Sequence, residues 1–138
     1  MTAIVDTSVW IRLFKDRSGL VKTAIEASVG TDRIVMVPPI RLELLQGCRG
    51  ELEWRSMQAR VSAFELLAMS ETSWDGAARL YYELRQVGLT IRSALDCLIA
   101  QLPIENNALL VHCDRDFETI ASVHPLKQDR LNLDTVQP

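Results

Sequence analysis

Apolar residues along the chain fall into short continuous runs that alternate with longer segments of helical spacing. The short runs, in IVD, RIVMV and ALLVHC, are typical of strands that are buried on both faces. Strands alternating with helices predict an α/β fold of three α/β/α layers around a mostly parallel sheet of about five strands. Strands are predicted at residues 3–5, 33–37, 64–69, 108–112 and 131–133.

The segments between these strands repeat apolar residues with the period of a helix. The clearest helix is 73–87, in which Ser73 can cap the first turn and Gly88 can end the last one. Proline is tolerated in a first turn but not inside a helix, so one helix begins near residue 40 and another ends before Pro103. Helices are predicted at 8–14, 20–28, from 40, 51–60, 73–87, 93–102 and in a short segment after 112.

The composition is that of an ordinary globular protein. With 138 residues, 48% of them hydrophobic and 24% charged, we expect one domain over residues 1–138. No apolar run approaches the roughly 20 residues of a membrane span. The first apolar stretch has no basic residues before it, so a cytoplasmic location is expected. The three cysteines are odd in number and lack metal-site spacing, which argues against a disulfide framework and a zinc finger.

Acidic residues recur where predicted strands end and the next helices begin. Asp6 and Asp114 follow the first and fourth strands, and Glu43 lies in the first turns of the helix after the second strand. Asp96 lies near the start of its helix, and Asp116 stands two residues beyond Asp114. Because ligands bind outside the carboxyl ends of parallel strands, we expect these acids to meet at one edge of the sheet.

Each acid also has a simpler interpretation. Asp6 and Asp114 can cap helices, and Asp96 can complete a capping box with Ser93. Glu43 can be a solvated residue near a helix start, and Asp116 can interact with the helix dipole in a first turn. Crowded carboxylates, however, repel one another and need protons or cations to neutralise them. A set of oxygen ligands without ordered histidines or cysteines favours a hard cation such as Mg²⁺ or Mn²⁺.

Four segments, IVDTSVWI, RLELLQG, ALDCLIA and HCDRDF, resemble the successive signatures of PIN-domain ribonucleases, and most closely the VapC toxins of type II VapBC toxin–antitoxin pairs. The resemblance covers nearly the whole chain, although Pro103 interrupts a helix that is usually longer in that family. It implies an endoribonuclease that cuts RNA with one or two Mg²⁺ or Mn²⁺ ions. It also implies a homodimer that assembles with a VapB-like antitoxin into a hetero-oligomer. By motif, the core acids are Asp6, Glu43, Asp96 and Asp114, the auxiliary acid is Asp116, and the hydroxyl near the metal is Ser8.

Mg²⁺ usually keeps only one or two protein carboxylates, so we assign Asp6 and Asp96 as the most direct ligands. Glu43 and Asp114 would orient water, act as base through it or, with Asp116, hold a second ion. The net charge of −3 gives no bulk attraction to nucleic acid, so RNA would need local cations. Candidates within a few residues of the acids are Arg12, Lys15, Arg41, Arg92 and Arg115. The alternative is that these residues are ordinary solvated charges or form salt bridges to neighbouring acids.

The segment 47–60, GCRGELEWRSMQAR, places Leu52, Trp54 and Met57 among charged residues without the wide apolar stripe of a core helix. Tryptophan and methionine are enriched in interface cores, so this segment is a candidate antitoxin-binding groove, with core packing as the alternative. For the whole chain, the competing hypothesis is a catalytically inert PIN-like module that binds a structural cation or a partner protein.

Overall fold

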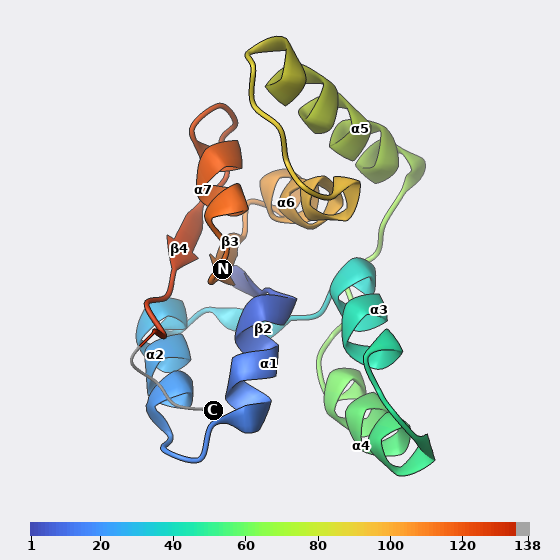
Figure 1. Ribbon diagram of the computed structural model, residues 1–138, viewed down its shortest axis with the longest axis vertical. Coiled ribbons are helices and arrows are strands. Elements are labelled where there is room, and N and C mark those ends of the chain that lie inside the picture. Colours follow the sequence, from blue (N-terminus) through green and yellow to red (C-terminus); the bar gives the residue numbers. More distant parts are fainter. Residues whose placement is uncertain (135–138) are drawn as a thin grey trace.

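The computed structural model describes residues 1–134, which fold around one parallel sheet of four strands (Figure 1). The strand order is β2-β1-β3-β4, and every pair is parallel. In the central pairing, Ala3 of β1 stands opposite Leu109 of β3. This order brings the carboxyl ends of β1 and β3 side by side. The strands are β1 (Thr2–Val5), β2 (Arg33–Val35), β3 (Leu109–His112) and β4 (Gln128–Arg130).

Helices cover both faces of the sheet. Successive side chains of a strand point to opposite faces, and Ala3, Ile4 and Val5 of β1 are all buried, so neither face is open to solvent. The predicted α/β/α layers are therefore confirmed. None of the helices in residues 1–134 is long and apolar enough to cross a membrane. The helices are α1 (Thr7–Lys15), α2 (Leu20–Val29), α3 (Pro38–Gln46), α4 (Glu51–Ser62), α5 (Glu71–Gln86), α6 (Ala94–Asn106) and α7 (Arg115–Ala121).

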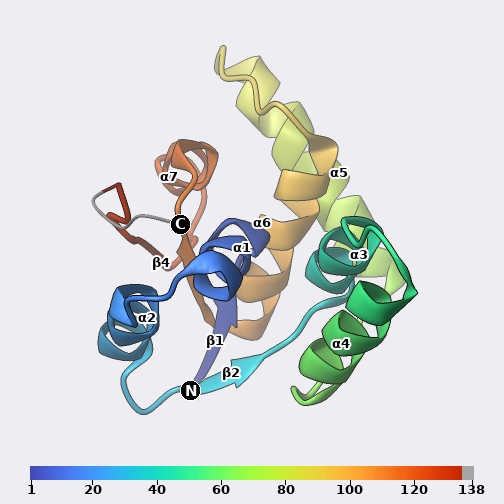
Figure 2. The same cartoon turned by 60° about the horizontal axis from the view of Figure 1, so that its bottom comes forward.

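Two helices lie away from the sheet, α5 at the top of Figure 1 and α4 at the lower right. Figure 2 shows α5 running alongside α6, its main packing partner. The two helices approach closely at Gly76, where an added Cβ atom would lie only 2.6 Å from the side chain of Gln101. Gly76 therefore leaves room for the end of the flexible Gln101 side chain between α5 and α6.

Two predicted strands are wrong. In segment 64–69 only Leu66 forms a bridge, to Met36, and it is 47% exposed, so the segment joins the sheet at one point without extending it. The last strand is β4, not 131–133. Its residues are polar because it pairs only with β3 and lies at the edge of the sheet, where backbone hydrogen bonds rather than side-chain burial hold it.

Several helix ends also differ from their predicted positions. The N-cap of α5 is Ser70 rather than Ser73, which is buried and completes a capping box with Ser70. Gly88, at φ +82°, follows the end of α5 as predicted. Pro103 does not end α6: the proline is buried with the core, and the helix continues to Asn106. The free energy gained by burying Pro103 in the core outweighs that of the backbone hydrogen bond that the proline removes.

Candidate active site at the sheet edge

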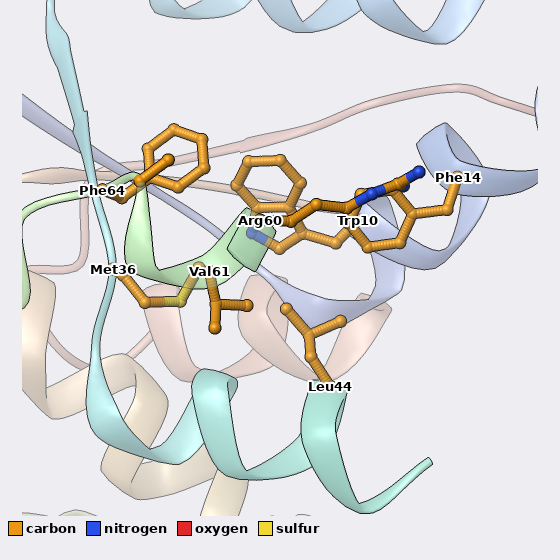
Figure 3. Close-up of a pocket in the computed structure, with 8 residues that line it drawn as sticks. Trp10, Phe14, Met36, Leu44, Arg60, Val61 and Phe64 are labelled. Atoms are coloured by element: carbon orange, nitrogen blue, oxygen red, sulfur yellow. The ribbon is translucent and has the colours of Figure 1, made fainter. Parts of the chain in front are cut away.

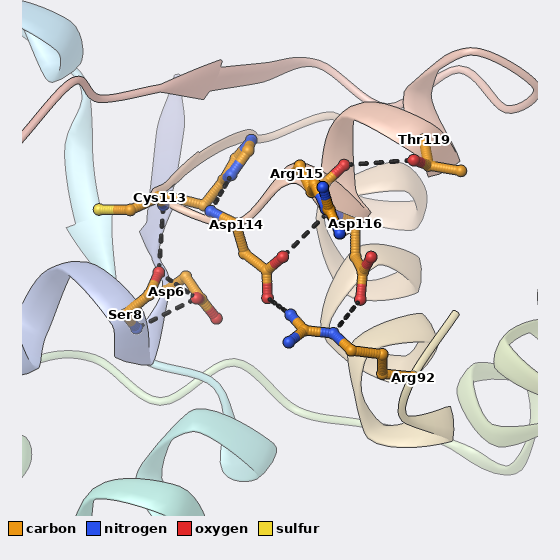
Figure 4. Close-up of polar contacts among 9 residues, drawn as sticks. Asp6, Ser8, Arg92, Cys113, Asp114, Arg115, Asp116 and Thr119 are labelled. Atoms are coloured by element: carbon orange, nitrogen blue, oxygen red, sulfur yellow. Dashed lines mark hydrogen bonds and ion pairs between the residues drawn. The ribbon is translucent and has the colours of Figure 1, made fainter. Parts of the chain in front are cut away.

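Asp6 lies at the turn between β1 and α1. Its backbone N–H donates to the carbonyl oxygen of Val111 in β3 at 2.8 Å, which fixes the turn against the neighbouring strand. Its Oδ2 atom accepts hydrogen bonds from the Ser8 N–H at 3.1 Å and from the Ser8 Oγ–H at 2.6 Å (Figure 4). Asp6 is therefore the N-cap of α1, and burial raises the pKa of its carboxyl against these lowering hydrogen bonds.

Ser8 joins the two strand ends that carry acids. Its hydroxyl oxygen accepts the backbone N–H of Cys113 at 3.1 Å while its proton goes to Asp6. Because the Ser8 hydroxyl both donates and accepts a hydrogen bond, it positions Asp6 and is not free to contact an ion. This link between the β1–α1 turn and the β3–α7 turn was not predictable from residue spacing.

The turn after β3 is held by polar side chains. His112 is buried, and its Nδ1 atom accepts the Asp114 N–H at 3.1 Å while Nε2 contacts Gln128 at 2.6 Å. Asp114 caps α7 through its Oδ1 atom, which accepts the Asp116 N–H at 3.0 Å. With both ring nitrogens engaged, His112 is a structural residue of the turn. The ligand set at this edge therefore consists of oxygen atoms.

Arg92 lies between two of the acids. Its Nη2 atom is 2.9 Å from Oδ2 of Asp114, and its Nε atom is 3.0 Å from Oδ2 of Asp116 (Figure 4). Of the two interpretations of Arg92, the structure shows the salt bridges to neighbouring acids, in which the guanidinium neutralises the acids themselves. The sequence did not indicate which acids Arg92 would pair with.

Asp96 stands in the first turn of α6 and is the acid most strongly affected by the others. One carboxylate oxygen each of Asp96, Asp114 and Asp116 lie within 4.8 Å of one another. Burial, followed by the negative charges of Asp6, Asp114 and Glu43, raises the pKa of Asp96 from 3.8 to about 7. The charge interactions show that Asp6 and Glu43 share this cluster, so the sequence-predicted acids do meet at one edge.

Glu43 approaches the cluster from α3. Its Oε1 atom accepts a hydrogen bond from the Thr7 hydroxyl at 2.7 Å, which orients the carboxylate toward the β1–α1 turn. Burial raises the pKa of Glu43, and the nearby charge of Asp6 raises it further. Thr7, immediately after Asp6 in the sequence, is thus a positioning residue that the motif alone did not identify.

The carboxylates fit a hard divalent ion. Among residues 1–134, no hydrogen-bond donor reaches the carboxylate of Asp96 or the Oε2 atom of Glu43. Crowded acids with free oxygens and a raised pKa are an arrangement that a cation stabilises. All the ligand atoms are oxygen, which favours Mg²⁺ or Mn²⁺ over a soft metal.

A family model for the PIN domain matches residues 3–123. VapC ribonuclease Mb1587 of Mycobacterium bovis is 31% identical over 127 residues, which cover 90% of this chain and 95% of that protein. Ribonuclease VapC11 of Mycobacterium tuberculosis matches with the same identity and coverage. The chain is a PIN-domain protein of the VapC family. The predicted resemblance is confirmed.

Solved structures agree with the fold of this PIN domain. The structure of VapBC2 from Rickettsia felis bound to a DNA fragment from their promoter superposes with a TM-score of 0.78 at 20% identity, covering 96% of this chain and 100% of that one. At this identity the likeness concerns the fold alone. The PIN fold was expected from the four sequence motifs, and its sheet has four strands instead of about five.

The other predicted cations of this PIN domain lie around the acids without pairing to them. Lys15 and Arg115 are exposed, and Arg41 is half-buried. Arg12 instead donates from Nη1 to the carbonyl oxygen of Leu133 at 3.0 Å, so it ties α1 to the segment after β4. Lys15, Arg41 and Arg115 therefore remain candidates for RNA contact, whereas Arg12 has a structural contact.

A groove of about 440 Å³ runs between α1, α3 and α4 of the PIN domain and reaches Glu43. Of the three predicted partner residues, Met57 lines this α1/α3/α4 groove, whereas Trp54 and Leu52 are 40% and 82% exposed on the surface of α4. Core packing is therefore excluded for the latter two. The groove is lined by Ile11, Phe14, Lys15, Glu43, Leu44, Gly47, Arg49, Glu53 and Met57.

A smaller apolar cavity of about 280 Å³ adjoins this groove (Figure 3). Phe14 belongs to both, and its ring packs beside Trp10 at a centroid distance of 5.9 Å and under the guanidinium of Arg60 at 4.7 Å. Phe64 closes another side, 5.2 Å from Trp10. Trp10, Phe14 and Phe64 thus form a packed aromatic cluster next to the α1/α3/α4 groove.

Proposed function

We propose that this chain is the toxin of a toxin–antitoxin pair and an endoribonuclease that uses Mg²⁺ or Mn²⁺ to hydrolyse RNA phosphodiester bonds. The observation that carries the proposal is the carboxylate cluster of Asp6, Glu43, Asp96, Asp114 and Asp116 at the sheet edge. Several oxygens of this cluster have no hydrogen-bond donor among residues 1–134. The chain is also 31% identical to a VapC ribonuclease.

Asp6 and Asp96 are the residues that we assign to hold the ion most directly. Asp6 offers a carboxylate whose Oδ2 atom Ser8 holds in place, and Asp96 offers a carboxylate that no donor in residues 1–134 engages. A bound divalent ion supplies neutralisation of the phosphate charge and a water of lowered pKa. Ser8 contributes by fixing the direction of Asp6 rather than by contacting the ion.

Glu43 is the candidate general base. The Thr7 hydroxyl holds one of its oxygens at 2.7 Å, which leaves the other free for the attacking water. Burial raises the pKa of Glu43 above its ordinary value, and a carboxylate with a higher pKa accepts a proton more readily. Lys15, Arg41 and Arg115 bring the RNA backbone to an edge that would otherwise repel phosphate.

The test is RNA cleavage by the purified chain and by Asp6→Asn, with Asp75→Asn on the exposed surface of α5 as the matched control. We expect cleavage that needs Mg²⁺ or Mn²⁺, is abolished by a chelator and by Asp6→Asn, and persists in Asp75→Asn. Mapping RNA ends after brief expression without an antitoxin would identify the RNA that is cut. A folded wild-type chain that binds the ion but cuts no RNA would instead support the inert interaction module.

We further infer that the partner is a VapB-like antitoxin that docks in the α1/α3/α4 groove. Ile11, Phe14 and Met57 give the groove an apolar floor, and charged residues rim it. This pattern suits an amphipathic segment. Because the groove reaches Glu43, such a segment can also place a basic side chain beside the acids. Homodimerisation stays a prediction from the family.

A further inference from the structure

The guanidinium of Arg92 has an unusual position for an exposed side chain. It stands in the segment between α5 and α6, and its side chain is 74% exposed. Yet two adjacent nitrogens, Nη2 and Nε, contact two different carboxylates, at 2.9 Å on Asp114 and 3.0 Å on Asp116. One edge of the guanidinium thus bridges two acids of the cluster.

These contacts divide the acidic cluster into two halves. In the first half, both oxygens of Asp114 are engaged, Oδ2 by Arg92 and Oδ1 by the Asp116 backbone N–H. In the second half, no hydrogen-bond donor among residues 1–134 engages the carboxylate of Asp96, although one of its oxygens lies within 4.8 Å of oxygens of Asp114 and Asp116. Asp6 accepts hydrogen bonds from Ser8 in its own turn. The ion pairs of Arg92 thus fall on Asp114 and Asp116, whereas no cation among residues 1–134 pairs with Asp6 or Asp96.

We propose that Arg92 is the resident cation of the Asp114/Asp116 half, so that the RNA-free protein holds one divalent ion, at Asp6 and Asp96. The inference rests on the proposed metal-dependent function and adds the number of ions and the residue that sets it. A second ion binds at Asp114 and Asp116 only when Arg92 leaves. Arg92 is thus a positioning residue of the site.

The physical reason is competition for the same oxygen atoms. A guanidinium keeps its charge at every working pH and fits two carboxylates side-on, which a hydrated ion cannot do without displacing it. A divalent ion placed at Asp114 beside Arg92 would also meet a like charge at contact distance. The Arg92 side chain is exposed and bridges only these acids, so it can rotate into solvent. Arg92 therefore weakens the binding of a second ion at Asp114 and Asp116 without preventing it.

The experiment counts Mn²⁺ ions bound per chain, from the loss of the free-ion electron paramagnetic resonance signal during titration of the full chain. We expect one ion for the wild type. Arg92→Gln should bind two ions, with affinity for the second about tenfold or more above the wild type. Arg92→Lys keeps the charge but loses the bridging geometry, so its second ion should bind less tightly than that of Arg92→Gln.

Arg115→Gln is the matched control, because Arg115 is an exposed neighbour of Asp114 and Asp116 without an ion pair to either. It should bind one ion, as the wild type does. Two ions of equal affinity in both wild type and Arg92→Gln would overturn the inference, as would a gain in Arg115→Gln as large as that in Arg92→Gln. If the wild type binds and cleaves but Arg92→Gln leaves the count at one, only the Arg92 inference fails. If the wild type binds no ion, the proposed function fails with it.

Discussion

Replacing Asp96 by asparagine removes the acid on which the other carboxylates of the cluster act most strongly. In the folded chain without metal, burial and the charges of Asp6, Asp114 and Glu43 raise the pKa of Asp96 from 3.8 to about 7. The ionised form is therefore destabilising, and an uncharged isostere of the same shape avoids this cost. We expect Asp96→Asn to be more stable than the wild type in the absence of divalent ions.

The size of this stabilisation and its pH dependence both follow from the raised pKa of Asp96. Raising the pKa from 3.8 to about 7 corresponds to about 4 kcal/mol, and solvent screening of this half-buried group reduces the free energy to about 2 kcal/mol. Below pH 3.8 Asp96 is protonated in both the folded and the unfolded chain, so nothing is gained. Between 3.8 and about 7 only the folded chain keeps the proton, so wild-type stability falls as pH rises. The advantage of Asp96→Asn grows through this window and is complete above it.

The assay is thermal unfolding of both chains at pH 5 and pH 8 with a chelator present. About 2 kcal/mol should raise the melting temperature of Asp96→Asn by roughly 6 °C at pH 8 and by clearly less at pH 5. The exposed Asp75→Asn should show no such pH dependence. Added Mg²⁺ should raise the melting temperature of the wild type more than that of Asp96→Asn, because the ion binds only the folded site. An equal advantage at both pH values would refute the crowding of charge around Asp96.

Three further predictions concern other parts of the molecule. Asp114→Ala should lower kcat/KM for RNA by on the order of tenfold more than Asp116→Ala, because Asp114 lies at the strand end and also caps α7. A larger loss of kcat/KM in Asp116→Ala at equal Mg²⁺ would contradict this prediction. Trp54→Ala should weaken antitoxin binding by about 2 kcal/mol in calorimetry with an unchanged melting temperature, since the side chain is 40% exposed; unaltered binding would place the interface elsewhere. Gly76→Ala should change the unfolding free energy of the wild type little, because the gain in helix propensity is offset by displacing the Gln101 side chain, but it should stabilise a Gln101→Ala background by about 1 kcal/mol. Denaturant unfolding of the double-mutant cycle measures this coupling, and additive effects would argue against the close approach.

Much of the site was predictable because the acids follow elements with strong sequence patterns. The apolar run before Asp6 and the one before Asp114 are buried strands, and their parallel pairing brings both acids to one edge. Asp96 was found by its motif and by its place at a helix start. The pattern of apolar residues failed at β4, where polar residues pair through the backbone at the edge of the sheet.

Side-chain contacts between segments far apart in the chain could not be predicted from the sequence. Nothing in the spacing of Arg92 and Asp114 indicates that an arginine in a connecting loop turns back onto two acids of another element. The same holds for Thr7 and Glu43, which are separated by 36 positions. Local patterns specify which elements form, whereas the directions of long polar side chains depend on how those elements pack.

The hydrogen bond from the Cys113 N–H to Ser8 has a consequence for the order of events during synthesis. It joins residues 105 positions apart, and the neighbouring hydrogen bond from the Asp6 N–H to Val111 spans the same number of positions. At about 5–20 residues per second, the ribosome delivers β1 and α1 several seconds before their partner strand exists. The residues that line the α1/α3/α4 groove, by contrast, all lie between positions 11 and 57. A chain that ends before β3 lacks Asp114, Asp116 and the strand that holds the Asp6 turn, so the acidic cluster can assemble only after most of the chain has been synthesised.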